Sequence, residues 1–191
     1  MFTLPSADGE PPDEPSIEGR RLAWDRDSAM AFRELADDEA VLLLTPAATA
    51  ACAPRGSPQD KAADPFQPLG EAMSTIHGRI RHVPYLYWMG VTDIIYKWLD
   101  RIPTVVIVVC EPPAGVKTQQ EVAKVMDRQR QFVHDAVSSY NYINQGTEPA
   151  SIAVIYFGTQ RYLPPEEIPI CLQFCNYETV KLSSVARSLL K

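Results

Sequence analysis

Residues 103–113 read P-T-V-V-I-V-V-C-E-P-P, and this stretch decides the fold. The run from Val105 to Cys110 contains no polar residue, so it lacks the alternation of a strand that faces water on one side. A continuous apolar run of this length is typical of the centre of a parallel sheet that helices cover on both faces. Proline on either side limits the strand, because proline cannot donate to the ladder. Glu111 then falls at the carboxyl end of the strand, where open α/β sheets bind their ligands.

The rest of the chain alternates between strand-like and helix-like patterns. Strands are predicted over 41–44, 80–87, 105–110, 151–157 and 168–174. Helices are predicted from a cap at Asp25 or Asp27 to about 38, over 64–78, 94–101 and 117–140, and from a cap at Asn176 or Thr179 to about 190. We therefore predict a three-layer, doubly wound α/β domain, in which a mostly parallel five-stranded sheet carries helices on both faces. Only the ten residues 158–167 join the last two strands, which is short for a crossover helix.

Several local signals set the expected boundaries. Asp64 followed by Pro65 predicts a helix start, Gly78 a left-handed helix end, and Thr92 an N-cap. Pro84 inside its strand indicates a sheet edge or an early strand end. The small-residue loop over 45–63 is predicted to be mobile.

The N-terminal segment differs from the rest in composition. Residues 1–18 carry five acidic residues, no basic residue and four prolines. Such a segment cannot bury enough apolar surface to offset the entropy lost on ordering. We predict a disordered, acidic, proline-rich leader over residues 1–21 and a single α/β sandwich domain over residues 22–191.

Composition and charge exclude several classes of protein. The chain is 46% hydrophobic and 22% charged, as ordinary globular proteins are. A net charge of −6 argues against a general nucleic-acid binder, which needs concentrated positive charge. No window approaches 18 consecutive apolar residues, and the first residues lack the basic start and apolar core of a secretory signal. We predict a cytoplasmic protein with no membrane partner.

The sequence also lacks the common signatures of cofactor and metal sites. It has no G-x-x-x-x-G-K-[ST] loop, no G-x-G-x-x-G after a strand and no G-x-S-x-G elbow, so we predict no cofactor. Cys171 and Cys175 lie about 13 Å apart if they share a strand, beyond disulfide reach. No histidine stands at ligand spacing from another, so no metal site is predicted, and the three histidines are interpreted as structural.

Glu111 is the leading candidate for chemistry. Its carboxylate at the end of a central strand could serve as an acid, a base or a hydrogen-bond acceptor, or it could simply accept backbone donors from the Pro112–Val116 loop. Thr92 and Asp93 occupy a comparable sheet end, although helix capping would explain them equally well. An aromatic cluster precedes Gly90 and is open to core packing, sugar stacking or partner binding; it comprises Tyr85, Tyr87, Trp88 and Met89.

Four segments resemble the C-terminal α/β sandwich domain of family 3 glycoside hydrolases, particularly the β-N-acetylglucosaminidase-like branch. They are A-M-A-F-R-E-L-A-D-D-E-A-V-L-L-L (29–44), the helix from Asp64 with I-R-H-V-P-Y (80–85), V-V-I-V-V-C-E (105–111), and F-G-T-Q-R-Y-L-P-P (157–165) followed by I-P-I-C-L-Q-F (168–174). The last segment is similar to that family's strand, short proline turn and final strand without a full helix between them. Thr159 in this turn joins Glu111, Thr92 and Asp93 as a candidate substrate-binding residue.

The resemblance implies a part of a hydrolase rather than a whole one. The family's nucleophile lies on a (β/α)8 barrel, which this chain is too short to include beside the sandwich. In the β-glucosidase branch the acid/base group comes from the sandwich, which makes Glu111 a conceivable counterpart. We therefore predict a domain that is non-catalytic by itself and that contributes packing, or part of a site for a β-linked sugar, to a barrel partner.

Two other hypotheses stay open. The chain could be a protein-interaction module on a flavodoxin-like scaffold without any sugar role. It could also be a small flavodoxin-like enzyme that binds a phosphate or nucleotide, although Pro112 and Pro113 remove backbone donors that would cradle a phosphate.

Overall fold

The computed structural model describes residues 19–47, 64–112, 118–144, 151–160, 162–175 and 179–191. The strands in these ranges are β1 (Gly19–Trp24), β2 (Val41–Pro46), β3 (Ile80–Tyr85), β4 (Thr104–Cys110), β5 (Ile152–Phe157) and β6 (Ile170–Phe174). The helices are α1 (Arg26–Arg33), α2 (Gln67–Ser74), α3 (Asp93–Arg101), α4 (Gln119–Ile143) and α5 (Thr179–Leu190). The predicted α/β class is confirmed.

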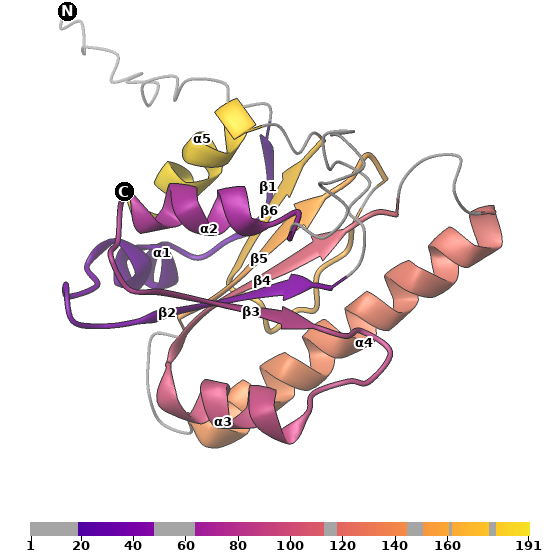
Figure 1. The fold of residues 1–191 in the computed structure, drawn as a ribbon, viewed down its shortest axis with the longest axis horizontal. Coiled ribbons are helices and arrows are strands. Elements are labelled where there is room, and N and C mark those ends of the chain that lie inside the picture. Colours follow the sequence, from indigo (N-terminus) through magenta and orange to yellow (C-terminus); the bar gives the residue numbers. More distant parts are fainter. Residues whose placement is uncertain (1–18, 48–63, 113–117, 145–150, 161, 176–178) are drawn as a thin grey trace, which may run out of the picture.

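The six strands form one mixed sheet in the order β1-β6-β5-β4-β2-β3, in which only β1 runs antiparallel to its neighbour. The five parallel strands follow the doubly wound order of flavodoxin-like sheets, which reverses direction between β2 and β4. Their arrowheads point toward the same side in Figure 1, and we call this side the carboxyl edge of the sheet.

The prediction of five strands was wrong, because β1 was missed. Its sequence, G-R-R-L-A-W, carries two arginines and no strict alternation, and as an edge strand it is half exposed. It pairs with β6 through a register shift between Arg21 and Ala23. Residues 19–21, which we assigned to the leader, belong to this strand. Residues 1–18 and most of the 45–63 loop lie outside the described residues.

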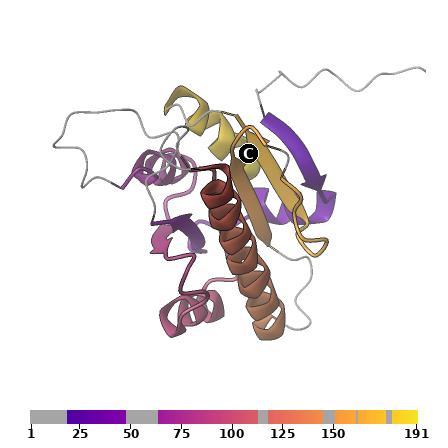
Figure 2. The same ribbon diagram turned by 90° about the vertical axis from the view of Figure 1, so that its right-hand side faces the viewer.

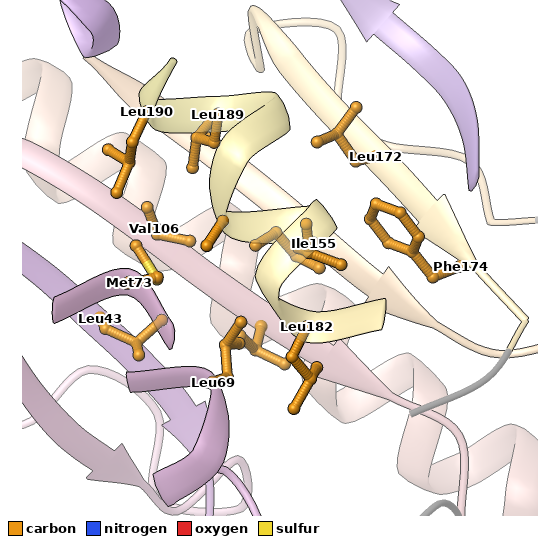
Figure 3. Packing of buried hydrophobic residues seen from close by; sticks show 14 of the residues in the cluster. Leu43, Leu69, Met73, Val106, Ile155, Leu172, Phe174, Leu182, Leu189 and Leu190 are labelled. Atoms are coloured by element: carbon orange, nitrogen blue, oxygen red, sulfur yellow. The ribbon is translucent and has the colours of Figure 1, made fainter. Parts of the chain in front are cut away.

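Helices cover both faces of the sheet (Figure 1). Helices α1, α2 and α5 pack on one face and α3 and α4 on the other. Alternate residues of β4 feed the two cores: Val106 and Val108 point to the first, and Val105, Ile107 and Val109 to the second. Figure 3 shows side chains of β2, β4, β5 and β6 meeting those of α2 and α5 in the first core. All seven residues of β4 are buried, as its apolar run predicts.

Several element ends differ from the predictions. The first helix ends at Arg33 rather than near 38, and α2 starts at Gln67 rather than at Asp64, whose carboxylate instead accepts the N–H of Phe66. Gly78 does not have the positive φ of a left-handed helix end, contrary to the prediction. Among the described glycines, the one with a positive φ is Gly90, at 67°. Two local predictions are confirmed: Thr92 caps α3, and the strand that contains Pro84 lies at a sheet edge.

The strands β2 and β4 separate before they reach the carboxyl edge. Their pairing stops at Leu44 and Ile107, although β4 continues to Cys110. Beyond this point the backbone groups of β4 that face β2 need other partners, because buried backbone polar groups are almost always hydrogen-bonded.

Two side chains supply these partners. The hydroxyl of Tyr85 donates to the carbonyl of Val108 at 2.8 Å. The Gln129 carboxamide accepts the N–H of Cys110 at 3.0 Å and donates to its carbonyl at 2.8 Å, as a neighbouring strand would. Tyr85 also stacks on Phe132 of α4, with ring centroids 3.7 Å apart. Tyr85 and Gln129 therefore fill the place in the sheet that β2 leaves.

This arrangement predicts a specific cost for removing the carboxamide. Gln129→Met keeps a similar length and volume but leaves the N–H and C=O of Cys110 without their partners. We expect the free energy of unfolding, measured by urea denaturation, to fall by about 1–3 kcal/mol. Gln131→Met, on the exposed side of the same helix, is the matched control and should stay within about 0.5 kcal/mol of the unmodified protein. Equal stability of the two variants would contradict the proposed role of Gln129.

Candidate functional site

A hydrogen-bonded cluster at the carboxyl ends of β4, β5 and β6 surrounds Glu111, and we call it the Glu111 clamp. Carboxylate oxygen Oε1 of Glu111 accepts the hydroxyl of Tyr156 at 2.5 Å and the N–H of Gln160 at 2.8 Å. Oxygen Oε2 accepts the N–H of Thr159 at 3.0 Å and the hydroxyl of the same residue at 3.3 Å. The donors come from β5 and the turn after it, not from the Pro112–Val116 loop that we considered, most of which lies outside the described residues.

The other side of the same turn is held by β6. Gln173 donates from Nε2 to the carbonyl of Gly158 at 3.1 Å and to the carbonyl of Gln160 at 2.8 Å. Gly158 allows the close approach, because an added Cβ would overlap the hydroxyl of Tyr156 and lie 2.6 Å from Cγ of Glu111. The turn is therefore fixed from two sides, and a side chain at residue 158 would break the clamp.

The clamp leaves little room for proton transfer by Glu111. A carboxylate offers about four acceptor positions, and four donors occupy them here. Burial, and then the hydrogen bond to Glu111, raise the pKa of Tyr156 far above its usual value, so this phenol remains a donor. The geometry suits a carboxylate that fixes a turn better than one that exchanges a proton with a substrate.

The structure brings together only some of the predicted site residues. Glu111 and Thr159 are hydrogen-bonded to each other. Thr92 lies beyond the edge strand β3, where its hydroxyl accepts the N–H of Ile95 at 3.5 Å as the cap of α3, and Asp93 is exposed in the first turn of that helix. The order of the strands places β2 between these two groups of residues.

The predicted aromatic cluster divides into a buried part and an exposed part. Tyr85 is buried between the sheet and α4, whereas Trp88 and Met89 are 53% and 58% exposed. Tyr87 meets Trp88 edge to face, with ring centroids 5.0 Å apart. Ile94 of α3 is also 67% exposed. We call the exposed residues Trp88, Met89 and Ile94 the β3–α3 apolar group; the first two belong to the predicted cluster and Ile94 follows them on α3.

A second polar group connects β2, β3 and the segment before α2. Nε2 of His82 lies 2.7 Å from the hydroxyl of the buried Thr45 and 3.5 Å from Oδ2 of Asp64. Burial lowers the pKa of His82, and the Asp64 carboxylate opposes this shift in part. His77, the residue before Gly78, is buried and bonded through Nε2 to the carbonyl of Glu39 at 2.7 Å. Both imidazoles hold segments of the fold together.

A shallow, open pocket of about 400 Å³ lies between α4 and the connection from β5 to β6. Its lining mixes both signs of charge with an apolar side, and comprises Asp127, Arg130, Gln131, His134, Leu163, Pro164, Pro165 and Glu167. None of the predicted site residues lines it, so it is separate from the Glu111 clamp.

Sequence reasoning missed Tyr156, Gln160 and Gln173 as members of the clamp and Gln129 as a partner of β4. For two of these residues, Gln129 and Gln173, the sequence pattern did indicate a buried hydrogen-bonding role. Gln129 stands in the apolar stripe of α4 and Gln173 inside an apolar strand, and both are buried. A single amide in an otherwise apolar run needs a hydrogen-bond partner in the core.

No protein-family model matches the chain, and no curated protein matches it either. Among solved structures, the chain is similar to the beta-glucosidase from Listeria innocua in complex with isofagomine, with a TM-score of 0.55 and 13% sequence identity. The match covers 89% of this chain and 23% of that chain. A part of that beta-glucosidase therefore shares this α/β architecture, and the chain spans less than a quarter of its length.

The clamp predicts a loss of stability when the carboxylate becomes an amide. In Glu111→Gln, an –NH2 group replaces one acceptor oxygen and faces donors that remain in place. We expect the free energy of unfolding to fall by about 1–3 kcal/mol in urea denaturation. Glu166→Gln, an exposed carboxylate in the connection to β6, is the control and should change little. If the Glu111 variant matches this control, the clamp does not stabilise the fold.

The lowered pKa of His82 predicts a dependence of stability on pH. Because the imidazole is harder to protonate in the folded state, the unfolded chain binds more protons as the pH falls through the unfolded value of about 6.5. The contribution of the neutral His82 to the free energy of unfolding should therefore be fully present above about pH 6.5 and be lost progressively below it. Thermal unfolding of the unmodified protein and of His82→Gln between pH 7.5 and pH 5 should show a smaller decrease in the variant. His134→Gln keeps His82 and should retain the full decrease.

Proposed function

We propose that this chain is a domain like the C-terminal α/β sandwich of family 3 glycoside hydrolases, and that it does not hydrolyse glycosides by itself. The observation that supports this best is the fold likeness, which extends over 89% of the chain and matches only part of a beta-glucosidase. The four sequence segments that resemble the family fall on α1 with β2, α2 with β3, β4, and β5 with β6. In this proposal the domain packs against a (β/α)8 barrel and forms part of its sugar site.

The chemistry of glycoside hydrolysis supports the non-catalytic part of the proposal. The reaction needs two carboxyl groups on either side of the scissile bond, one of which protonates the leaving group. Glu111 is the candidate for one of them, and its acceptor positions are occupied by Tyr156, Thr159 and Gln160. A carboxylate in this state must break its own hydrogen bonds before it can exchange a proton.

The same clamp suits a role in sugar binding. It fixes the backbone of residues 158–160 while the side chains of Thr159 and Gln160 remain exposed at the carboxyl edge. The Gln160 carboxamide can donate to and accept from the hydroxyls of a β-linked sugar, and the Thr159 hydroxyl, which donates to Glu111, can still accept from them, at a low cost in conformational entropy because the turn is fixed. Thr92 and Asp93 would contribute only if the bound sugar or the barrel extended past β2 toward the start of α3.

One observation favours the alternative of a protein-interaction module. The β3–α3 apolar group exposes a tryptophan, a methionine and an isoleucine, and aromatic residues and methionine are enriched in protein interfaces. This surface fits a protein partner with or without a sugar role. The nucleotide-binding alternative is less well supported, because Tyr85 and Gln129 fill the point between β2 and β4 where flavodoxin-like sheets bind their ligands.

A hydrolysis assay with the purified chain tests the proposal. We expect no turnover of 4-nitrophenyl β-glucoside or β-N-acetylglucosaminide above the buffer rate, for the unmodified protein and for Glu111→Gln alike. We also expect millimolar methyl β-glucoside to shift the backbone NMR signals of Thr159 and Gln160 while signals from α5 remain unchanged.

Two outcomes would contradict specific parts of the proposal. Turnover that Glu111→Gln abolishes, in a variant that remains folded by circular dichroism, would make Glu111 catalytic. Unchanged signals at Thr159 and Gln160 across the titration would exclude the sugar-binding role and favour the interaction module. In that case, Trp88→Ser with Met89→Ser should weaken binding to the partner without affecting the clamp.

A further inference from the structure

The strand β3 forms one edge of the sheet, and Figure 2 shows it at the end opposite to β1. A sheet edge presents backbone N–H and C=O groups that can pair with a further strand. The other edge strand, β1, is interrupted by its register shift, whereas β3 pairs with β2 without a shift over its whole length. The outer side of β3 is therefore the more regular template for an added strand.

The hydrogen bonds to β2 show which backbone groups of β3 face outward. The N–H of Val41 donates to the carbonyl of Arg79, just before the strand, at 2.9 Å, and the N–H of Ala47 donates to the carbonyl of Tyr85, at its end, at 2.8 Å. Backbone groups alternate in direction along a strand, so the residues with odd numbers from 79 to 85 bond toward β2. The residues with even numbers between them turn their backbone groups outward.

Three residues make up this outward row. Ile80 and His82 each present an N–H and a C=O, and no backbone hydrogen bond joins these groups to another residue that the structure describes. Pro84 presents only its C=O, because its ring replaces the N–H. The proline thus stands where the ladder with β2 needs no donor, and it confines complete strand pairing to the amino-terminal half of β3.

Two arginines lie beside the outward row. Arg79 and Arg81 are two residues apart, so their side chains project from the same face of the sheet, the one on which Val83 and Tyr85 pack toward α3 and α4. Both arginines are exposed, and within the described ranges neither forms an ion pair with a carboxylate. The edge therefore combines unpaired backbone groups with two unbalanced positive charges.

These features select among the occupants that an edge strand can take. A second copy of β3, paired antiparallel through His82, would place Arg81 of the two copies at diagonal positions on one face, where like charges repel each other. A nucleic acid offers negative charge but no peptide backbone to continue the ladder. An extended peptide that carries carboxylates satisfies both the backbone groups and the arginines. We propose that β3 binds an acidic, extended segment of a partner protein as an added strand.

The geometry also sets the sequence pattern of this segment. Its acidic residues must stand two apart, in an acidic-x-acidic pattern, to lie opposite Arg79 and Arg81 on one face. In an antiparallel segment, Arg81 meets its opposite residue at a non-hydrogen-bonded position, where the side chains of paired strands come closest. The residue between the two acids bonds through its backbone to Ile80. Backbone bonds then supply affinity and the two charge pairs supply selectivity.

A synthetic peptide, acetyl-T-V-E-V-E-V-T-amide, tests the proposal, with a control peptide in which both glutamates are glutamines. Each is added to the full chain and followed by ¹H–¹⁵N NMR and amide hydrogen exchange. We expect the glutamate peptide to shift the amide signals of Ile80 and His82 and to slow their exchange. The amides of Arg81 and Val83 already bond to β2 and should keep their exchange rates. The glutamine peptide should bind about fivefold more weakly.

Matched variants separate the charges from the backbone bonds. Arg81→Gln should weaken binding of the glutamate peptide about twofold to threefold and leave the glutamine peptide unaffected, whereas Arg187→Gln, in the last turn of α5, should change neither. N-methylation of the valine between the two glutamates removes the N–H that donates to the carbonyl of Ile80. This peptide should bind at least about fivefold more weakly than the unmodified one.

Several outcomes would overturn the proposal. It fails if neither peptide affects the amides of Ile80 and His82, if the two peptides bind equally tightly, or if Arg81→Gln behaves like Arg187→Gln. It also fails if exchange at Ile80 and His82 slows with rising protein concentration in the absence of peptide, because the occupant is then a second copy. Tighter binding of an oligothymidylate than of the glutamate peptide would assign the arginines to a nucleic acid instead. None of these readouts depends on the proposed sugar role.

Discussion

The carboxyl end of β4 imposes the constraint on which the rest of this fold depends. The strand lies at the centre of the sheet and is buried throughout, yet β2 pairs with it only as far as Ile107. The backbone groups beyond that point cannot remain without partners in the core, because an unpaired buried polar group costs about 1–3 kcal/mol. Tyr85 from β3 and Gln129 from α4 both reach this place. A β-strand, a helix and the edge of the sheet are thereby fixed relative to one another.

The placement of Tyr85 and Gln129 beside the end of β4 affects where the sheet can bind a ligand. In a doubly wound sheet the gap between the two strands at the switch point is the usual site. Here Tyr85 and the Gln129 carboxamide fill that gap and stabilise it by hydrogen bonds and by stacking on Phe132. In the part of the chain that the structure describes, the polar groups of the Glu111 clamp lie on the other side of β4, where Glu111 bonds toward β5. Among the described residues, the ends of β4, β5 and β6 are therefore the part of this edge that offers polar groups for a function.

The sequence predicts the layers of this fold better than it predicts the contacts between them. The apolar runs of β4 and β5 and the stripe of α4 arise from burial, which acts on each residue separately, and they identify these elements directly. Strand β1 was not predicted because it lies half exposed at the edge of the sheet. Its sequence therefore lacks the apolar pattern that would indicate a strand paired with β6. The start of α2 is displaced because Asp64 is engaged with His82 and with the N–H of Phe66. Such long-range partners leave no periodic signal.

The same distinction applies to Glu111. The position of Glu111 at the end of a central strand could be predicted. The hydrogen bonds of its carboxylate could not, because the four donors come from residues 45 to 49 positions away in the chain. A catalytic carboxyl group must alternate between protonation states, and this requires donors that can be released. The Glu111 carboxylate instead accepts four hydrogen bonds that fix the turn at Gly158. The clamp therefore supports the proposal of a domain that shapes a site and does not itself transfer a proton.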